Sequence, residues 1–280
     1  WGCKIMPGSS VFKDNLFKEK KVFVTGGATG MGFGFARAFL EHGADVIIAS
    51  RKEGNLVKAA ADMMDQTGKT LHWKTMDVRD AETVEEVATY IKDTWGHLDV
   101  LVNNAAGNFV TPAAAMSENA WRAVVDIVLD GTFRVSKACY PLLRKSGDGS
   151  SIVNIIANYA WGAAPFVAHS GAAKAGVLNL TRTLALEWSK DNIRVNAMCP
   201  GVVLTENVKK NLMLDDSVIE IFKSNIPAGG ITDAEKMAQQ VLYLCSPAAS
   251  VITGDMLVAD GGEWLVGNNF YQIGKKFFDE

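Results

Sequence analysis

Several features that would place a protein in a special class are scarce in this sequence of 280 residues. The four cysteines lie far apart, without the spacing of a metal site or a redox pair, which favours free thiols in a reducing compartment. No run of about 18 apolar residues occurs, so no membrane-spanning helix is predicted. The net charge is −3 and there is no basic stripe, so a nucleic-acid partner is not expected.

Linkers, internal repeats and low-complexity blocks are also absent, which favours a single domain. Short, continuously apolar segments alternate with segments of helical periodicity along the chain. This alternation predicts an α/β domain in which helices cover both faces of a doubly wound parallel sheet. We expect this domain over residues 21–265, an N-terminal arm over 1–20 and a C-terminal tail over 266–280.

The same patterns place the elements along the chain, with a variable polar segment left over at 204–230. Strands of a seven-stranded sheet are predicted over residues 22–24, 44–50, 71–76, 99–103, 151–156, 193–198 and 256–259. Helices are predicted from residue 31 onward and over 55–66, 80–95, 117–145, 171–189 and 234–244.

A glycine-rich turn between the first strand and the first helix predicts a phosphate-binding site. The spacing is Thr25-Gly26-x-x-x-Gly30-x-Gly32, which differs from the general Gly-x-Gly-x-x-Gly fingerprint. Glycine lets the backbone approach a pyrophosphate, and the following helix N-terminus supplies N–H groups and partial positive charge. We expect nucleotide contacts from Gly26, Thr29, Gly30, Met31 and Gly32.

Residues after the second and third strands point to the kind of nucleotide, because ligands of such sheets bind at the carboxyl ends of the strands. An acidic residue after the second strand would favour NAD, but Ser50 and Arg51 stand there. A guanidinium suits a 2′-phosphate, which favours NADPH as the cofactor. The alternative is that Arg51 is only a solvated charge at the end of the strand. Asp77, followed by Val78, has two interpretations: an acceptor for the adenine amino group or a helix N-cap.

Two further strand ends carry candidate cofactor contacts. The fourth strand runs into Asn103 and Asn104, which either touch the ligand or tie this strand to its neighbours. Ala105 and Gly107 continue the same turn. After the sixth strand, Pro200, Gly201, Val203 and Thr205 form a further turn, in which the Thr205 hydroxyl either reaches the cofactor or has no role.

Four ordered motifs resemble the short-chain dehydrogenase/reductase family over about residues 20–262. They are Thr25-Gly26-x-x-x-Gly30-x-Gly32, Asn103-Asn104-Ala105-Ala106-Gly107, Lys174 after the fifth strand, and Pro200-Gly201. The resemblance implies a Rossmann-type domain, a nicotinamide cofactor held in part by Lys174, and a homotetramer.

The chain departs from the common pattern of that family at its catalytic positions. Ser170 stands four residues before Lys174, where the family has a tyrosine, and Ala157 stands where a serine is expected. Val128 replaces an asparagine. A ketone reductase without its phenol lacks the general acid for a developing alkoxide. The chain is therefore either inactive or the catalyst of a different reaction.

A subfamily resemblance favours different chemistry. Asn108 directly after the Asn-Asn-Ala-Ala-Gly turn, and Tyr159 fifteen residues before Lys174, resemble the 2,4-dienoyl-CoA reductases, particularly the mitochondrial type. The resemblance implies that Tyr159 and Asn108 stabilise a dienolate, that Lys174 holds the nicotinamide ribose, and that Ser170 binds the cofactor or orients Tyr159. Taken singly, each of these residues also has an ordinary role in packing, turns or capping.

Other functions remain open at this point. Residues 169–176 and 246–254 are similar to peroxisomal trans-2-enoyl-CoA reductases. A non-catalytic NADP-binding module is a third hypothesis, which Asn108 with Tyr159 argues against. We expect an acyl-CoA substrate and an intracellular, reducing location: the mitochondrial matrix by analogy, or the cytoplasm of a prokaryote. The C-terminus is not a Ser-Lys-Leu type peroxisomal signal.

Overall fold

A seven-stranded parallel sheet forms the centre of the computed structural model, which describes residues 11–205 and 216–266. The strand order is β3-β2-β1-β4-β5-β6-β7. This confirms the predicted doubly wound α/β fold. The strands are β1 (Lys21–Thr25), β2 (Asp45–Ser50), β3 (His72–Thr75), β4 (Val100–Asn103), β5 (Ser150–Ile155), β6 (Ile193–Pro200) and β7 (Met256–Ala259).

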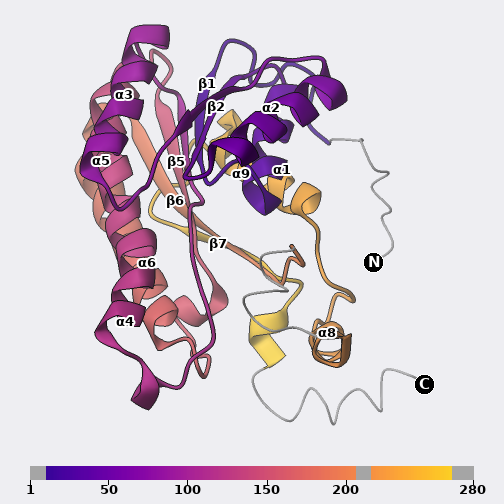
Figure 1. Ribbon diagram of the computed structural model, residues 1–280. Helices are drawn as coiled ribbons and strands as arrows, with labels where there is room; N and C mark the ends of the chain where they lie inside the picture. The colour runs from indigo at the N-terminus through magenta and orange to yellow at the C-terminus, as the bar shows by residue number, and fades with distance from the viewer. Residues whose placement is uncertain (1–10, 206–215, 267–280) are drawn as a thin grey trace.

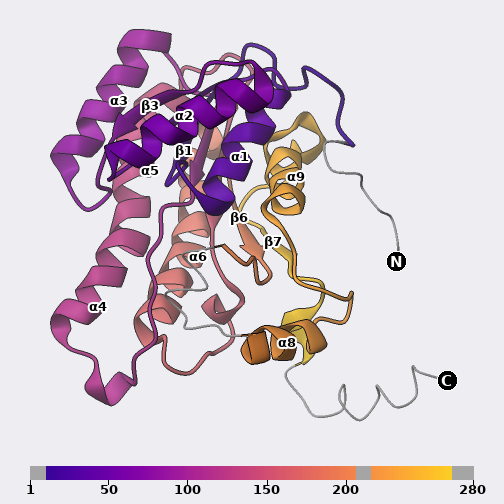
Figure 2. The same ribbon diagram turned by 45° about the vertical axis from the view of Figure 1, so that its right-hand side comes forward.

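Helices cover both faces of the sheet (Figure 1). On one face lie α1 (Gly30–Glu41), α2 (Glu53–Thr67) and α9 (Ala234–Cys245), and on the other lie α3 (Ala81–Trp95), α5 (Gly131–Leu143) and α6 (Ala168–Trp188). The inner strands are apolar on both sides because both sides are buried: β4, for example, is buried along its whole length. Figure 2 shows α1 beside α9, whose sequences lie far apart.

The arm before β1 packs on the first helix in its described part. Phe17 is buried, and its ring meets that of Phe39 edge-on with centroids 4.9 Å apart. Residues 1–10 and most of the tail lie outside the described residues, so the predicted division into arm, domain and tail remains a prediction.

Two predicted helices differ from the structure. The expected helix over 117–145 is divided into α4 (Glu118–Val125), a π-helical turn (Asp126–Asp130) and α5. A π turn accommodates one more residue per turn than an α-helix, and the periodicity of the sequence did not reveal it. The helix expected from residue 171 begins at Ala168, so Ser170 and Lys174 both lie within its first turns. A short helix, α8 (Asp216–Ser224), lies within the polar segment 204–230.

Candidate active site

A cavity of about 400 Å³ opens at the carboxyl ends of β1 to β4. Apart from Asn103, the predicted cofactor residues between Gly26 and Gly107 all line it, and so does Thr205. Pro200, Gly201 and Val203 do not. Gly201 instead lets the backbone pass close to Asp260, because a Cβ on Gly201 would lie 2.8 Å from the Cα of Asp260.

The glycine turn forms the floor of this cavity as a tightly closed cradle. Gly26 has a φ of +64°, and a Cβ on Gly32 would lie 2.3 Å from the Gly26 carbonyl oxygen. The Asn104 side-chain amide donates to the carbonyls of Thr25 (3.0 Å) and Gly26 (3.2 Å). Asn104 thus ties β4 to the glycine turn and also lines the cavity, and its contact with the ligand stays a prediction.

The N-terminus of α1 faces the cavity with its backbone N–H groups available. Its N-cap, Thr29, makes no side-chain capping hydrogen bond, and the first turn contains no acidic residue. Unsatisfied N–H groups and the helix dipole attract an anion at such a position. The cradle therefore fits the pyrophosphate of a dinucleotide.

Thr25 holds two strands in place behind the cradle, and the predicted site omitted it. Its buried hydroxyl accepts hydrogen bonds from the backbone N–H groups of Asn104 and Ala105, both at 3.0 Å. Asn103 is also buried, and its side-chain amide donates to Ser136 (2.9 Å) and Asn154 (2.8 Å). Asn103 therefore ties β4 to its neighbours, which is the second of its two interpretations.

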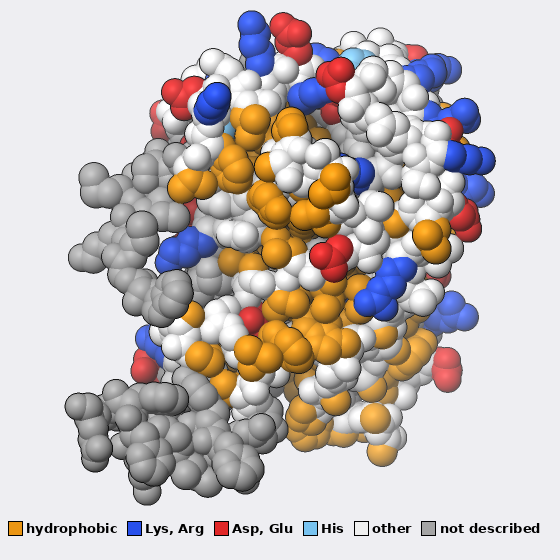
Figure 3. All heavy atoms as spheres, turned by 180° about the vertical axis from the view of Figure 1, so that it is seen from behind, with side chains coloured by type: hydrophobic (Ala, Val, Ile, Leu, Met, Phe, Trp, Pro, Cys, Tyr) orange, Lys and Arg blue, Asp and Glu red, His pale blue; other side chains and the backbone are white. Residues whose placement is uncertain are grey.

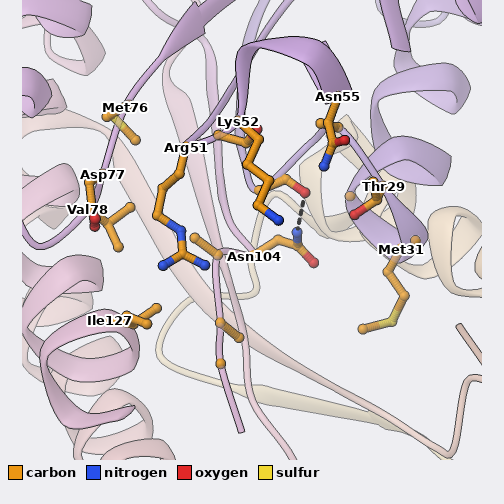
Figure 4. A pocket seen from close by; sticks show the side chains of 18 of the residues that line it. Thr29, Met31, Arg51, Lys52, Asn55, Met76, Asp77, Val78, Asn104 and Ile127 are labelled. Atoms are coloured by element: carbon orange, nitrogen blue, oxygen red, sulfur yellow. Dashed lines mark hydrogen bonds between the residues drawn. The ribbon is translucent and has the colours of Figure 1, made fainter. Parts of the chain in front are cut away.

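Basic side chains project into one side of the cavity. In Figure 4, Arg51 and Lys52 point into it, with Asp77 and Val78 on one side and Asn55 on the other. The interpretation of Asp77 as a helix N-cap is wrong, whereas its contact with the adenine amino group stays a prediction. The N-cap of α3 is Asp80, whose carboxylate accepts from Glu82 N. Asp77 instead pairs with Arg79, and these hydrogen bonds lower the pKa of its carboxyl group.

Sequence reasoning missed several other lining residues. Four of them have small or apolar side chains that look like packing residues, and the other two, Lys52 and Asn55, look like ordinary surface residues. Ile127, from the unpredicted π-helical turn, reaches the cavity opposite Lys52 and Asn55 (Figure 4). The residues absent from the prediction are Ala28, Lys52, Asn55, Met76, Ala106 and Ile127.

The predicted catalytic residues after β5 form one cluster. Tyr159 lies in a short 3₁₀ turn (Asn158–Ala160), and its hydroxyl is 3.2 Å from that of Ser170, which is buried in the first turn of α6. One turn further along α6, the Lys174 ammonium donates to the carbonyl of Ile155 at the end of β5. The structure therefore brings Tyr159, Ser170 and Lys174 together.

Burial sets the charges of this cluster. It raises the pKa of the Tyr159 hydroxyl, against a smaller opposing effect of Ser170, so Tyr159 keeps its proton and can donate a hydrogen bond. Burial lowers the pKa of Lys174 to about 8. The thiol of Cys199 lies close to both, and its pKa of about 12 keeps it neutral.

The loop that carries Asn108 is fastened to the beginning of α6. The Phe109 ring meets His169 edge-on with centroids 4.6 Å apart, and Thr111 N donates to the Phe166 carbonyl at 2.9 Å. Asn108 Oδ1 accepts from the next backbone N–H at 3.0 Å, which leaves the NH₂ group of its side chain as the donor.

The lowered pKa of Lys174 predicts a pH dependence of stability. An ordinary value of 10.5 in the unfolded chain against about 8 in the folded chain corresponds to about 3 kcal/mol. Below pH 8 both states hold the proton and this destabilisation is fully present. Between pH 8 and 10.5 the unfolded chain binds more protons, so stability rises with pH. Urea unfolding without cofactor at several pH values measures this rise.

The control for this prediction is Lys174→Met, which keeps the aliphatic stem and removes the charge. Other titrating groups contribute equally to both proteins. Between pH 8 and 10.5 the free energy of unfolding of the wild type is therefore expected to increase relative to that of the variant. Parallel pH profiles would contradict a buried, charged Lys174.

Fold and cradle together define a nucleotide-binding oxidoreductase domain, and comparison with known proteins identifies its class. Residues 26–263 match the family described as Enoyl-(Acyl carrier protein) reductase, and the chain belongs to this family of short-chain dehydrogenases/reductases. A short-chain dehydrogenase from Bacillus anthracis is 40% identical, with a TM-score of 0.79, over 90% of this chain and 99% of its own. The citronellol catabolism dehydrogenase of Pseudomonas aeruginosa is 31% identical, with a TM-score of 0.80, over 91% and 99%.

Curated relatives narrow the class further. The peroxisomal 2,4-dienoyl-CoA reductase of Rattus norvegicus, named as (3E)-enoyl-CoA-producing, is 40% identical over 91% of this chain and 87% of its own. A probable 2,4-dienoyl-CoA reductase of Bacillus subtilis, named as (2E)-enoyl-CoA-producing, is 38% identical over 89% and 98%. The predicted resemblance to this group is confirmed. In the described residues no helix is long and apolar enough to cross a membrane.

Proposed function

We propose that the protein is an NADPH-dependent reductase of 2,4-dienoyl-CoA thioesters that forms 3-enoyl-CoA in the oxidation of unsaturated fatty acids. The observation that carries the proposal is the position of the Tyr159 hydroxyl 3.2 Å from that of Ser170, which lies one turn of α6 before the buried Lys174. Both curated relatives described above are named as 2,4-dienoyl-CoA reductases, and the Rattus norvegicus protein is named for the (3E)-enoyl-CoA product proposed here.

The residues present fit a bound nicotinamide dinucleotide. The glycine cradle and the N-terminus of α1 would hold the pyrophosphate, Arg51 the ribose phosphate, and Lys174 the nicotinamide ribose. NADPH, when bound, supplies the hydride that reduces the δ carbon of the dienoyl chain.

In this mechanism Tyr159 and Asn108 stabilise the charge that develops on the substrate. Reduction at the δ carbon places negative charge on the thioester oxygen as an extended dienolate. Tyr159 donates from its protonated hydroxyl and Asn108 from its NH₂ group, as in an oxyanion hole. Ser170 holds the Tyr159 hydroxyl in place. Protonation of the dienolate at the α carbon then gives the 3-enoyl product.

The choice of NADPH predicts a specific effect of Arg51→Gln. A guanidinium forms charge-assisted hydrogen bonds with a 2′-phosphate, so its loss should raise the KM for NADPH about tenfold or more while the KM for NADH stays the same. Steady-state kinetics with both nucleotides measures the change. Lys92→Gln, which removes an exposed charge on α3, is the control. A parallel loss with both nucleotides would show that Arg51 does not read the phosphate.

The substrate is tested by the oxidation of NADPH, followed by absorbance, with trans-2,trans-4-hexadienoyl-CoA and decadienoyl-CoA against trans-2-enoyl-CoA and acetoacetyl-CoA. Turnover confined to the dienoyl thioesters supports the proposal. Faster turnover of the 2-enoyl thioester would make the protein a trans-2-enoyl-CoA reductase, which the name of the matching family favours. NADPH binding without turnover of any of these thioesters would instead indicate that the protein is a non-catalytic NADP-binding module.

We also propose a homotetramer in an intracellular, reducing compartment of the mitochondrial-matrix type. Hydrophobic side chains gather over the centre and lower part of one face of the molecule (Figure 3). Phe133 on α5 and Leu186 on α6 are among the exposed apolar residues, and apolar surface of this kind serves in subunit contacts. Light scattering of the protein as it elutes from a size-exclusion column measures the mass of the assembly, which should be about four times that of one chain.

A further inference from the structure

A second cavity of about 400 Å³ lies at the opposite edge of the sheet from the proposed active site. It is bounded by the amino ends of β4, β5 and β6, by the arm before β1, and by the segment after α9. Its size is within the usual range of small-molecule sites. The polar groups that line it include Lys20, Asp99, Asp148, Arg194, Ser246 and Ser250.

Arg194 is the unusual group in this cavity. Its side chain is partly buried, and burial lowers the pKa of its guanidinium. One guanidinium nitrogen donates to the carbonyl of Ile252 at 3.2 Å. Within residues 11–205 and 216–266, Arg194 makes no ion pair with a carboxylate, whereas Arg37, Arg79 and Arg144 each have at least one.

Cys245, a titratable neighbour of Arg194, does not neutralise it. Burial raises the pKa of the Cys245 thiol to about 12, so this thiol carries no charge at neutral pH. A partly buried cation without a counter-ion is unfavourable, and an anion with hydrogen-bonding oxygens relieves this cost.

The acidic groups of the cavity are engaged at its other end. Asp99 is buried and accepts from Lys21 N (2.8 Å) and from the Ser146 hydroxyl (2.6 Å). Lys20 lies between Asp99 (3.4 Å) and Asp148 (2.9 Å). This end of the cavity therefore holds two carboxylates and one ammonium group, so its net charge is negative. A ligand with two negative charges is disfavoured there.

Apolar side chains form the remaining wall. Leu16 and Phe17 from the arm, Val100 from β4 and Pro247 line the cavity together with the polar groups. A ligand that fits both Arg194 and this apolar wall carries a single negative charge at one end and a small apolar body at the other.

We propose that this cavity binds a small monocarboxylate with a short apolar chain, held by Arg194. The planar guanidinium matches the two oxygens of a carboxylate in a bidentate arrangement. The hydroxyl group of Ser250 lies in the same lining and offers a further donor. The site is separate from the nucleotide cavity and does not depend on the proposed reaction.

Titration calorimetry of the full chain with sodium butyrate tests the proposal, with sodium chloride at the same ionic strength as the blank. Saturable binding is expected, and Arg194→Gln should weaken it about tenfold or more because charge-assisted hydrogen bonds are lost. The matched control, Arg182→Gln, removes an exposed guanidinium on α6 outside the cavity and should leave the affinity unchanged.

A second variant tests the cavity without touching the guanidinium. Ser250→Leu places a larger side chain in the lining at an exposed position, and it should abolish butyrate binding while circular dichroism shows an unchanged fold. The proposal is overturned if the wild type binds no butyrate, if it binds inorganic phosphate in preference, or if both cavity variants bind butyrate as the wild type does.

Discussion

Tyr159→Phe should lower the turnover of 2,4-dienoyl-CoA by about 10²–10³-fold, the usual effect of removing one oxyanion donor. The variant loses only the hydroxyl oxygen, which lies 3.2 Å from the Ser170 hydroxyl. The ring keeps its place in the turn before α6, so the free energy of unfolding and the affinity for NADPH should change little. Steady-state kinetics, NADPH titration and urea unfolding together measure these three quantities.

Tyr140→Phe is the matched control for that experiment. Its hydroxyl donates to Asp191 at 2.6 Å, at the far end of α5 from the cluster. Loss of that hydrogen bond should lower stability only slightly and leave turnover unchanged. Turnover of Tyr159→Phe within about tenfold of the wild type would show that the tyrosine hydroxyl is not an oxyanion donor.

The fold was predictable because its signals are local. Each strand is a short apolar run, and each of the main helices repeats its apolar residues at helical spacing, so both can be read within a few residues. The π-helical turn at Asp126–Asp130 is different. It lies inside a continuous helical pattern and depends on how that helix packs, for example on Gly131, where a Cβ would lie 2.7 Å from Val78 Cγ2.

The cavity was predictable to the extent that its residues lie directly at strand ends. The glycine turn and Arg51 were found because their position in the chain determines their position in the fold. The partners of Asp77 were not predictable. Its carboxylate can cap a helix, bind a ligand or pair with a neighbour, and only the folded geometry selects Arg79. The buried position of Lys174, which sets its pKa, likewise depends on the packing of α6 on β5 and β6.

Gly32→Ala should disable the cradle through a single methyl group. The added Cβ would lie 2.3 Å from the Gly26 carbonyl oxygen and 2.5 Å from Asn104 Nδ2, so the turn and α1 must move apart. Overpacking of this kind costs about 1–3 kcal/mol of stability. Displacement of the phosphate-binding groups by about an ångström should reduce NADPH-dependent turnover about 10²-fold. Thermal unfolding without nucleotide and NADPH titration separate the two effects.

Gly54→Ala controls for the same change of residue in the same region. Gly54 lies at the beginning of α2, close to the basic side of the cavity, and a Cβ there meets nothing within 4 Å. Alanine is the better helix former, so stability should stay the same or rise by up to about 1 kcal/mol, with the affinity for NADPH unchanged. If Gly32→Ala bound NADPH as tightly as Gly54→Ala does, the close contact of Gly32 with Gly26 and Asn104 would not be what shapes the nucleotide site. If only Gly32→Ala lost affinity for NADPH, the shape of the turn would be what allows the nucleotide to bind. Neither substitution changes a charge or a hydrogen-bonding side chain.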